Sequence, residues 1–286
     1  MTIAVYGSRR QHSVTDIIGQ FLKNLRARGI KVLMHCKLYD HLSEIAPDIL
    51  KGVVPSDSCA GADLIVSLGG DGTFLRTAMW VGADQIPVVG VNSGHLGYLS
   101  ALAIEELPYL IDYLENDRFR IEPRALLCVE APELPDYVGC YALNEVSLTR
   151  EETASMMTAG VCLDGAPLAD YRADGLLVCT STGSTAYNLS VGGPIVQPTL
   201  EVCVLAPIAA HSLSMRPMVV DAHSTITIVP SGRSRHLRLA LDGRSVLIDM
   251  ETEIRISRAP FKLQVVVPAS HTFADTLRHK LHWGEQ

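Results

Sequence analysis

A glycine-rich turn surrounds a single aspartate near residue 70. The segment Gly69-Gly70-Asp71-Gly72-Thr73 follows the apolar run Ala62–Leu68, and residues up to Trp80 favour a helix. Glycine adopts positive φ values and lets a phosphate approach closely, and the free N–H groups of a helix start favour anions. The pattern predicts that the Asp71 carboxylate has almost no side-chain cover where phosphates bind, and that it can accept a proton or help to hold a metal ion.

An ordinary strand-to-helix turn would also use aspartate and glycine. Three glycines around one acid, at the carboxyl end of an apolar strand, favour a ligand site instead, because ligands of open α/β sheets gather at that edge. A second glycine-containing turn, Asn92–Leu99, follows the next apolar strand. We expect it beside the Asp71 turn on the same sheet edge, although a plain connector is the alternative.

Two polar segments in the second half of the chain are also candidates for ligand binding. Asn144-Glu145 interrupts the apolar run Ala142–Leu148, and an amide beside a carboxylate can bind ribose hydroxyls or an adenine edge. The hydroxyl-rich run Thr180–Ser190 predicts a helix start that offers N–H and hydroxyl groups to a polar ligand. A purely structural explanation remains open for both segments. Strand alternation would turn one of Asn144 and Glu145 towards solvent, and the run Thr180–Ser190 could cap a structural helix.

Familiar catalytic and metal-binding patterns are missing from the sequence. No Gly-x-Ser-x-Gly elbow and no Gly-x4-Gly-Lys-Ser/Thr loop occurs, so we expect neither a serine hydrolase nor a Walker-type NTPase. The seven cysteines stand singly without a Cys-x-x-Cys pair, which argues against a disulfide framework and a zinc site. We therefore name no protein ligand for a metal.

Composition is that of an ordinary soluble protein. The 286 residues are 48% hydrophobic and 19% charged, with a formal net charge of −7. A negative balance argues against a general nucleic-acid or anionic-membrane binder. Apolar runs are too short to span a bilayer and no signal peptide is recognisable, so we expect a cytoplasmic protein with no membrane partner.

The patterning predicts two domains of different class. Residues 1–118 alternate strand and helix, with helices expected over 42–50 and 104–115 among others. This alternation indicates an α/β domain with an open, mostly parallel sheet that carries the Asp71 turn. Residues 119–268 consist mainly of short β-rich runs separated by turns, which indicates an all-β, sandwich-like domain interrupted by one helix over 182–191. Residues 269–286 end in a helix. The fold is then α+β overall, with an active-site cleft between the two domains.

These motifs together resemble the NAD kinase family over most of the chain. The resemblance rests on the Asp71 turn, on Asn-Ser-Gly-x-Leu-Gly-Tyr-Leu, on Leu-Asn-Glu-Val, and on the run from Arg172-Ala-Asp-Gly through Thr182-Gly-Ser-Thr-Ala-Tyr to Gly192-Gly193-Pro194. The first turn by itself also fits diacylglycerol-kinase-like lipid kinases. The Thr-Gly-Ser-Thr-Ala-Tyr stretch with Asn-Glu upstream is specific.

The resemblance implies an enzyme that moves the γ-phosphoryl group of ATP, with Mg²⁺ or another divalent metal, onto the adenosine-ribose 2′-hydroxyl of NAD. It also implies a homo-oligomer, a dimer or tetramer, and a final segment that returns towards the N-terminal domain. Asp71 matches the proton acceptor. The positions that match NAD contacts are Asp71, Gly72, Arg76, Asn144, Glu145, Arg172, Asp174, Thr185, Ala186, Tyr187, Asn188, Leu189 and Ser190.

Some positions depart from the family pattern. Ser181 and Ala210 replace usual prolines, and Arg244 stands where many members carry glutamine, so we assign no ligand contact to Arg244 or to the variable position Ser155. Two other functions compete with NAD phosphorylation. One is a lipid kinase, which would need an apolar channel that the polar run 182–190 argues against. The other is a non-catalytic NAD(P)-binding regulator.

Overall fold

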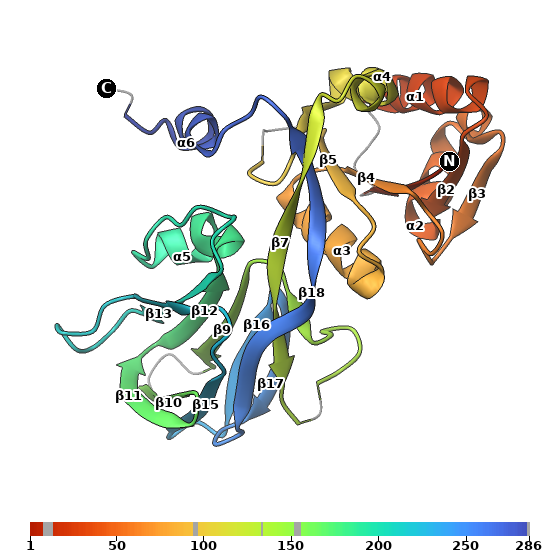
Figure 1. Ribbon diagram of the computed structural model, residues 1–286. Coiled ribbons are helices and arrows are strands. Elements are labelled where there is room, and N and C mark those ends of the chain that lie inside the picture. Colours follow the sequence, from red (N-terminus) through yellow and green to blue (C-terminus); the bar gives the residue numbers. More distant parts are fainter. Residues whose placement is uncertain (8–13, 94–96, 133, 152–155, 285–286) are drawn as a thin grey trace. The chain divides into compact units, whose positions relative to one another are not determined.

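The chain forms two compact units. The computed structural model describes residues 1–7, 14–93, 97–132, 134–151 and 156–284 (Figure 1). The first unit combines Met1–Pro123 with Leu263–Gln286, and the second is Arg124–Lys262. The chain passes from one unit to the other within two long strands, β7 (Phe119–Glu130) and β18 (Ile254–Pro268).

A parallel sheet forms the centre of the first unit, as the alternation of strands and helices predicted. Its order is β5-β4-β1-β2-β3, and the end of β18 adds to it parallel to β5 through Val265 and Val266. The short strand β6 also pairs with β5. The strands are β1 (Thr2–Gly7), β2 (Lys31–His35), β3 (Val53–Ser56), β4 (Leu64–Leu68), β5 (Val88–Asn92) and β6 (Leu102–Ala103).

Helices cover both faces of this sheet (Figure 1). Successive side chains of β4 point to opposite faces of the sheet. Val66 and Leu68 pack into the core that contains Ile18 and Phe21 of α1. On the other face, the Ser67 hydroxyl lies 2.8 Å from the Thr77 hydroxyl of α3. The helical segments of this unit are α1 (Thr15–Ala27), α2 (Cys36–Ile45), η2 (Pro47–Leu50), α3 (Asp71–Val81), η3 (Gly82–Asp84), η4 (Ile104–Tyr109), α4 (Leu110–Glu115) and α6 (Phe273–Leu281).

The second unit consists of two antiparallel sheets. One has the order β14-β13-β12-β9-β16-β17; the other runs β11-β10-β15-β18, with β7 beside β18 and β8 beside β7. The prediction of a β-rich, sandwich-like domain is confirmed. Its further elements are β8 (Tyr141–Ala142), β9 (Glu145–Arg150), β10 (Met157–Leu163), β11 (Ala166–Ala173), β12 (Gly175–Thr180), η5 (Thr182–Thr185), α5 (Tyr187–Ser190), β13 (Val202–Ile208), β14 (Met218–Asp221), β15 (Ile226–Gly232), β16 (His236–Leu241) and β17 (Arg244–Asp249).

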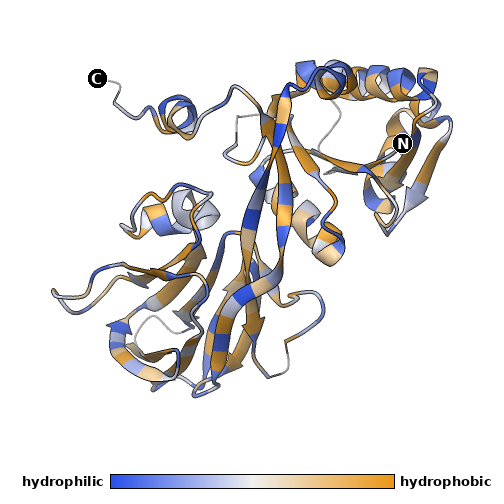
Figure 2. Cartoon of the chain, viewed as in Figure 1, coloured by the Kyte–Doolittle hydropathy of each residue, from blue (hydrophilic) through white to orange (hydrophobic). Residues whose placement is uncertain are grey.

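Strand β12 has an unusual position because both of its faces are buried. Leu176 and Val178 point into the core between the two sheets, whereas Leu177 and Cys179 join a smaller apolar cluster on the other face with Val196. The apolar colouring of these strands is visible in Figure 2. A strand covered on both sides holds its ends rigidly, and the hydroxyl-rich segment begins directly after it.

Four element predictions were inaccurate for physical reasons. Helix α3 begins at Asp71 rather than after it, since Gly70 is its N-cap and an acid is favourable in the first turn. The helix expected over 104–115 is divided into η4 and α4, with Pro108 inside η4. The helix expected over 182–191 is the pair of short segments η5 and α5. The one expected over 42–50 starts earlier, at Cys36, and is followed by η2.

The strands missed from the sequence lie at sheet edges. Strands β3, β11 and β14 end their sheets in the observed order and leave many of their side chains partly or fully exposed. Such strands carry little apolar alternation to recognise. Among the described residues, no helix combines the length and the apolar character needed to cross a bilayer.

The buried hydroxyl pair between β4 and α3 provides a stability test. Thr77 donates to the Thr73 carbonyl oxygen at 2.9 Å while its hydroxyl contacts that of Ser67, and both side chains are buried. Thr77→Val leaves the Ser67 hydroxyl unpaired, so we expect a loss of about 1–3 kcal/mol in the free energy of unfolding, measured by urea denaturation. Thr77→Ser is the matched control, and Ser67→Ala added to Thr77→Val should recover part of the loss. A wild-type midpoint for Thr77→Val would contradict this role.

Candidate active site

The Asp71 carboxylate is held by two backbone amides of the neighbouring turn. Tyr98 N–H donates to Oδ2 at 2.8 Å and Leu99 N–H donates to Oδ1 at 3.0 Å. The prediction that the turns after β4 and β5 lie side by side is therefore confirmed for Tyr98 and Leu99; Gly94, His95 and Leu96 lie outside the described residues. The expectation of an almost bare acid was right only for side chains, because backbone groups cover it.

The three glycines of the Asp71 turn have different roles. Gly69 has a φ of +145°, and a Cβ there would lie 2.5 Å from the Thr73 hydroxyl oxygen, so packing requires glycine. Among the described residues, a Cβ at Gly70 would meet no atom within 4 Å, and one at Gly72 would meet only an Arg76 nitrogen at 3.9 Å. Packing does not demand glycine at these two positions, which leaves room for a ligand to approach the backbone.

Gly97 closes the other side of the carboxylate. A Cβ at Gly97 would overlap Oδ1 of Asp71, so glycine lets the second turn come this close. Arg76 lies one turn along α3, is exposed, and donates to the Thr73 hydroxyl at 3.2 Å. The first unit thus joins Asp71, Gly72 and Arg76 at the carboxyl end of the sheet, with a carboxylate and an exposed cation.

In the second unit, Asn144 and Glu145 are positioned by a residue that the sequence analysis missed. The buried carboxylate of Asp242 accepts the backbone N–H groups of Leu143 at 2.7 Å, Asn144 at 2.8 Å and Glu145 at 3.1 Å. Asp242 occupies the two-residue turn between β16 and β17 with a φ of +48°. The Asp242-Gly243 pair predicts only a turn, and nothing in the sequence indicates that Asp242 holds Asn144 and Glu145.

Burial next to Asp242 makes Glu145 a weak acid. Desolvation, and to a lesser extent the charge of Asp242, raises the pKa of Glu145 to about 7. The backbone amide of Tyr187 acts in the opposite direction, because its hydrogen bond favours the charged form. Burial also raises the pKa of Asp242, and its three amide donors act in the opposite direction. The Glu145 carboxyl can therefore take up or release a proton near neutral pH.

The hydroxyl-rich segment packs directly against this pair. Thr180 donates its backbone N–H to the Asn144 carbonyl oxygen at 2.9 Å, and a Cβ at Gly183 would overlap that same oxygen. The buried atoms Asn144 Oδ1, Glu145 Oε2, Thr182 Oγ1 and Asn188 Oδ1 have no hydrogen-bond partner among the described residues. Buried polar atoms without partners are costly, and a polar ligand would satisfy those that it reaches.

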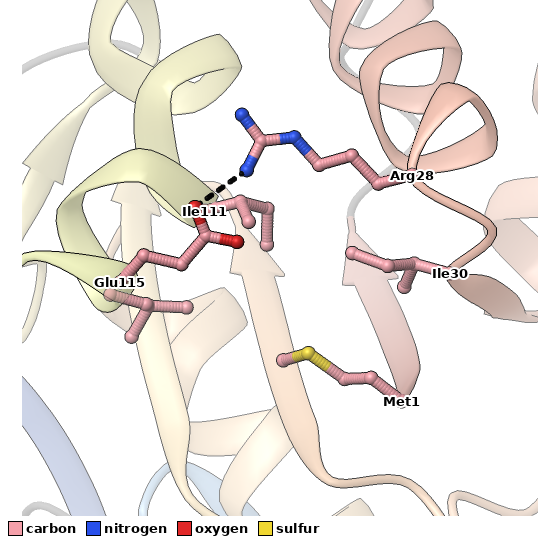
Figure 3. Close-up of a pocket in the computed structure, with 6 residues that line it drawn as sticks. Met1, Arg28, Ile30, Ile111 and Glu115 are labelled. Carbon is pink, nitrogen blue, oxygen red and sulfur yellow. Dashed lines mark hydrogen bonds and ion pairs between the residues drawn. The ribbon is translucent and has the colours of Figure 1, made fainter.

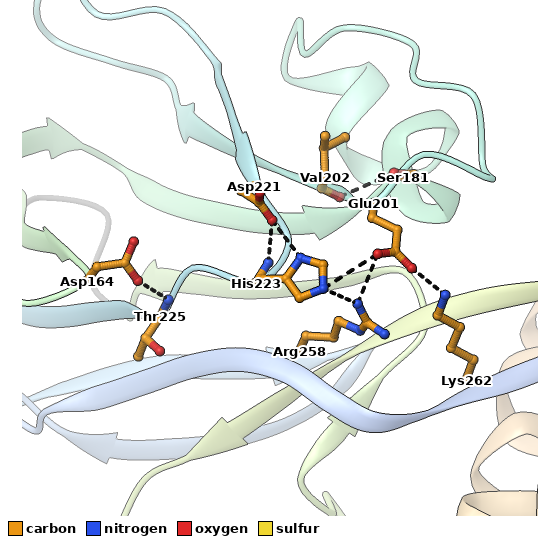
Figure 4. Close-up of polar contacts among 9 residues, drawn as sticks. All are labelled: Asp164, Ser181, Glu201, Val202, Asp221, His223, Thr225, Arg258 and Lys262. Carbon is orange, nitrogen blue, oxygen red and sulfur yellow. Dashed lines mark hydrogen bonds and ion pairs between the residues drawn. The ribbon is translucent and has the colours of Figure 1, made fainter.

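The predicted contacts within 185–190 differ in exposure. Tyr187 and Ser190 are exposed, Thr185, Ala186 and Leu189 are half-buried, and Asn188 is buried. The Asn188 amide donates to the carbonyl oxygens of Ser184 and Pro194, which ties the segment together. Ser181, which replaces the expected proline, donates to the carbonyl oxygens of Leu200 at 2.5 Å and of Val202 at 3.2 Å, the second of which Figure 4 shows. These bonds fix the segment to the start of β13.

Arg172 and Asp174 do not join the Asn144 cluster. Gly175 pairs with Thr149 and Cys179 with Glu145 in the β12–β9 ladder, which separates the two ends by about 13 Å. At its own end, Asp174 binds Arg150 at 2.9 Å and lies 3.6 Å from His211 Nε2. A ligand that touches both groups in one subunit must be as long as a dinucleotide.

Arg244 has a structural environment. Its guanidinium is partly buried and donates to the carbonyl oxygens of Leu241 at 3.1 Å, Val138 at 2.6 Å and Tyr141 at 2.6 Å. This supports leaving Arg244 out of the ligand contacts; Ser155 lies outside the described residues. Within the described part of the chain, no group of three or more His, Cys, Asp or Glu side chains is placed to hold a metal ion.

Two other features lie apart from these groups within their own units. A cavity of about 660 Å³ in the first unit borders Met1, Ile30 and Glu115, at the amino-terminal edge of the sheet and so opposite Asp71 (Figure 3). In the second unit, Glu201 pairs with both Arg258 and Lys262, and His223 bridges Glu201 and Asp221 (Figure 4). These ion pairs are partly exposed and contribute little to stability.

The raised pKa of Glu145 predicts how stability depends on pH. Since the folded-state pKa lies above the unfolded value, the unfolded chain releases the proton first, and stability falls as pH rises from about 4.5 to 7. Glu145→Gln should match wild type near pH 4.5 and exceed it above pH 7 by at most about 3 kcal/mol in free energy of unfolding. Denaturant titrations across this range measure it, with exposed Glu130→Gln as the control. A difference independent of pH would contradict the assignment.

Comparison with known proteins identifies relatives that match almost the whole chain. Family models for the ATP-NAD kinase N-terminal domain and C-terminal domain match residues 9–119 and 143–267. NAD kinase from Porphyromonas gingivalis is 41% identical over 285 residues, which cover 99% of this chain and 98% of the relative. NAD kinase from Christiangramia forsetii is 36% identical over 290 residues and covers 100% and 99%.

Solved structures show the same fold. The yeast NADH kinase complexed with NADH has a TM-score of 0.88 at 24% identity and covers 100% of this chain and 89% of that one. An NAD kinase from Archaeoglobus fulgidus in complex with ATP has a TM-score of 0.71 at 26% identity, with coverage of 99% and 98%. The NAD kinases from Porphyromonas gingivalis and Christiangramia forsetii, at 41% and 36% identity, match this chain over nearly their full lengths. The chain therefore belongs to the NAD kinase family.

Proposed function

We propose that this protein is an ATP-dependent NAD kinase that transfers the γ-phosphoryl group of ATP to the 2′-hydroxyl of the adenosine ribose of NAD, giving NADP and ADP. The observation that carries the proposal is the Asp71 carboxylate, oriented by two amides in a turn where Gly70 and Gly72 leave open space. The family to which the chain belongs catalyses this kind of transfer, and the ATP and NADH named for its solved relatives are nucleotides of the required kind.

Asp71 accepts the proton of the attacking hydroxyl in this proposal. A ribose hydroxyl is a weak nucleophile at neutral pH, so a positioned carboxylate that takes its proton accelerates the transfer. The amides of Tyr98 and Leu99 each bind one carboxylate oxygen and orient the group, while the remaining lone pairs are free to face substrate. Arg76 and the start of α3 add positive potential for phosphate.

A divalent metal accompanies ATP. Mg²⁺ usually binds through substrate phosphates, water and one or two carboxylates, and it neutralises phosphate charge when bound. Both Asp71 oxygens already accept backbone amide hydrogens. Asp71 can therefore make one further contact to the ion, but it does not supply a complete set of protein ligands. We therefore assign the ion mainly to the phosphates, with Asp71 as the carboxylate of the first unit that would contact it.

The second unit supplies NAD recognition. Asn144 and Glu145 are held by Asp242 and carry unpartnered buried oxygens, which suits them to ribose hydroxyls or an adenine edge. Residues 185–190 offer backbone groups, hydroxyls and the exposed Tyr187 ring to the same substrate. Arg172 and Asp174 stay predicted contacts, at the other end of β12.

Location, assembly and domain limits are inferences from the resemblance. We infer a cytoplasmic enzyme that forms dimers or tetramers, with domains at 1–118 and 119–268 and a C-terminal segment over 269–286. The free cysteines of the described chain suit a reducing compartment. Light scattering on the purified chain measures its mass, and a monomer would refute the oligomer.

One assay separates the three candidate functions. Purified protein is incubated with ATP, Mg²⁺ and NAD while NADP is measured, with diacylglycerol offered in parallel. NADP formation supports the proposal, a phosphorylated lipid supports a lipid kinase, and nucleotide binding without product supports a regulator.

Replacement of Asp71 tests the proton acceptor. Asp71→Asn should lower kcat at least about 10²-fold while NAD binding stays near wild type, because the amide has a similar shape but cannot take the proton. Its NH2 group cannot accept from Tyr98 or Leu99, so we also expect a modest decrease in the melting temperature. Asp16→Asn is the matched control, since Asp16 is an exposed acid in the first turn of α1. A kcat near wild type in Asp71→Asn refutes the role.

Replacement of Asn144 tests NAD recognition. Asn144→Ala removes a buried unpartnered oxygen and should raise KM for NAD roughly 10-fold, with less effect on KM for ATP. Steady-state kinetics with each substrate varied in turn measure both constants, with the exposed residue in Asn116→Ala as the control. If only KM for ATP changes, the assignment is wrong.

A further inference from the structure

The C-terminal helix brings a lysine to the turn that holds Asp71. Helix α6 starts with a reciprocal cap in which Thr272 and Asp275 bind each other, and its last turn carries Lys280. The Lys280 side chain is half-buried, and its ammonium donates to the Gly97 carbonyl oxygen. It also lies 5.5 Å from the centroid of the Tyr98 ring. All of these residues belong to the first unit.

These contacts continue to the carboxylate. Gly97 immediately precedes Tyr98 and Leu99, whose N–H groups bind the two oxygens of Asp71. A Cβ at Gly97 would overlap the same carboxylate, so this backbone lies against Asp71 with no spare space. A cation that fixes the Gly97 carbonyl therefore fixes both the distance and the angle at which the amides meet Asp71.

Lys280 also faces Asp71 electrostatically. Burial lowers the pKa of Lys280 to about 8, and the charge of Asp71 opposes this decrease. Among the described residues, two other titratable groups lie near this lysine. Burial, followed by the charge of Lys280, lowers the pKa of His271, and burial, followed by the charge of Asp71, raises the pKa of Tyr98. On α6 itself Asp275 pairs with Arg278, and Arg120 binds the carbonyl oxygens of Pro268, Ala269 and His271. The neighbouring His279 also lowers the pKa of His271.

We propose that Lys280 is a positioning residue for phosphoryl transfer, whose ammonium holds the Gly97–Leu99 turn against Asp71. The inference rests on the proposed function of Asp71 as proton acceptor. An uncharged amine would donate a weaker hydrogen bond to the Gly97 carbonyl oxygen, since charged donors form the stronger bonds.

The test compares Lys280→Met, Lys280→Arg and wild type in kcat and KM for NAD from pH 6 to 10. Lys280→Met keeps the aliphatic length but has no charge, and should lower kcat about 10- to 100-fold with little change in KM. Wild-type kcat should fall as pH rises through about 8, where Lys280 loses its proton. This decrease should be absent in Lys280→Met and move to higher pH in Lys280→Arg, whose guanidinium stays charged.

Arg278→Met is the matched control, because it removes an exposed cation from the same helix. Equal losses in Lys280→Met, Lys280→Arg and Arg278→Met would show that only the helix matters and would overturn the proposal. So would a wild-type kcat in Lys280→Met, or an alkaline decrease that persists in it. If the wild-type protein makes no NADP, the proposed function itself fails. If the wild-type protein makes NADP and Lys280→Met makes it at the same rate, only the inference about Lys280 fails.

Discussion

The contact between the Asp71 carboxylate and the amides of Tyr98 and Leu99 is the constraint on which the first unit depends. It joins the turns after two adjacent parallel strands, β4 and β5, and so holds the open edge of the sheet together. Glycine is required at Gly69, where a Cβ would collide with Thr73, and at Gly97, where a Cβ would collide with the Asp71 carboxylate. Gly70 and Gly72 are free of this requirement, which is why we place substrate beside them.

The second unit uses the same physical device for a different purpose. Asp242 accepts three successive backbone amides, from Leu143 to Glu145, in a buried setting. In both units an acid on one element orders the backbone of another, since a carboxylate has enough lone pairs to bind several N–H groups. Both residues are half-buried, but Asp71 borders the space beside Gly70 and Gly72, whereas the Asp242 carboxylate binds three amides and serves to present Asn144 and Glu145.

This arrangement makes the site costly for the folded chain. The partnerless oxygens of Asn144, Glu145 and Thr182 and the raised pKa of Glu145 all disfavour the free protein. Strand β12, which is buried on both faces, compensates with apolar packing. A site that is unfavourable without ligand and rigidly supported is preorganised for binding, because the ligand replaces missing hydrogen bonds without ordering the chain.

The sequence by itself determined the fold class and the chemistry of the Asp71 turn, since strand alternation, helical spacing and glycine punctuation are local properties. It also predicted that the two turns meet, because parallel strands end at one edge. It did not reveal the edge strands, whose exposed side chains carry little pattern, nor the start of α3 at Asp71. Only tertiary structure brought Asp242 to Asn144 across 98 residues and Lys280 to Gly97 across 183, and left Arg172 and Asp174 at the far end of β12. Such contacts depend on register and chain path, which no local pattern encodes.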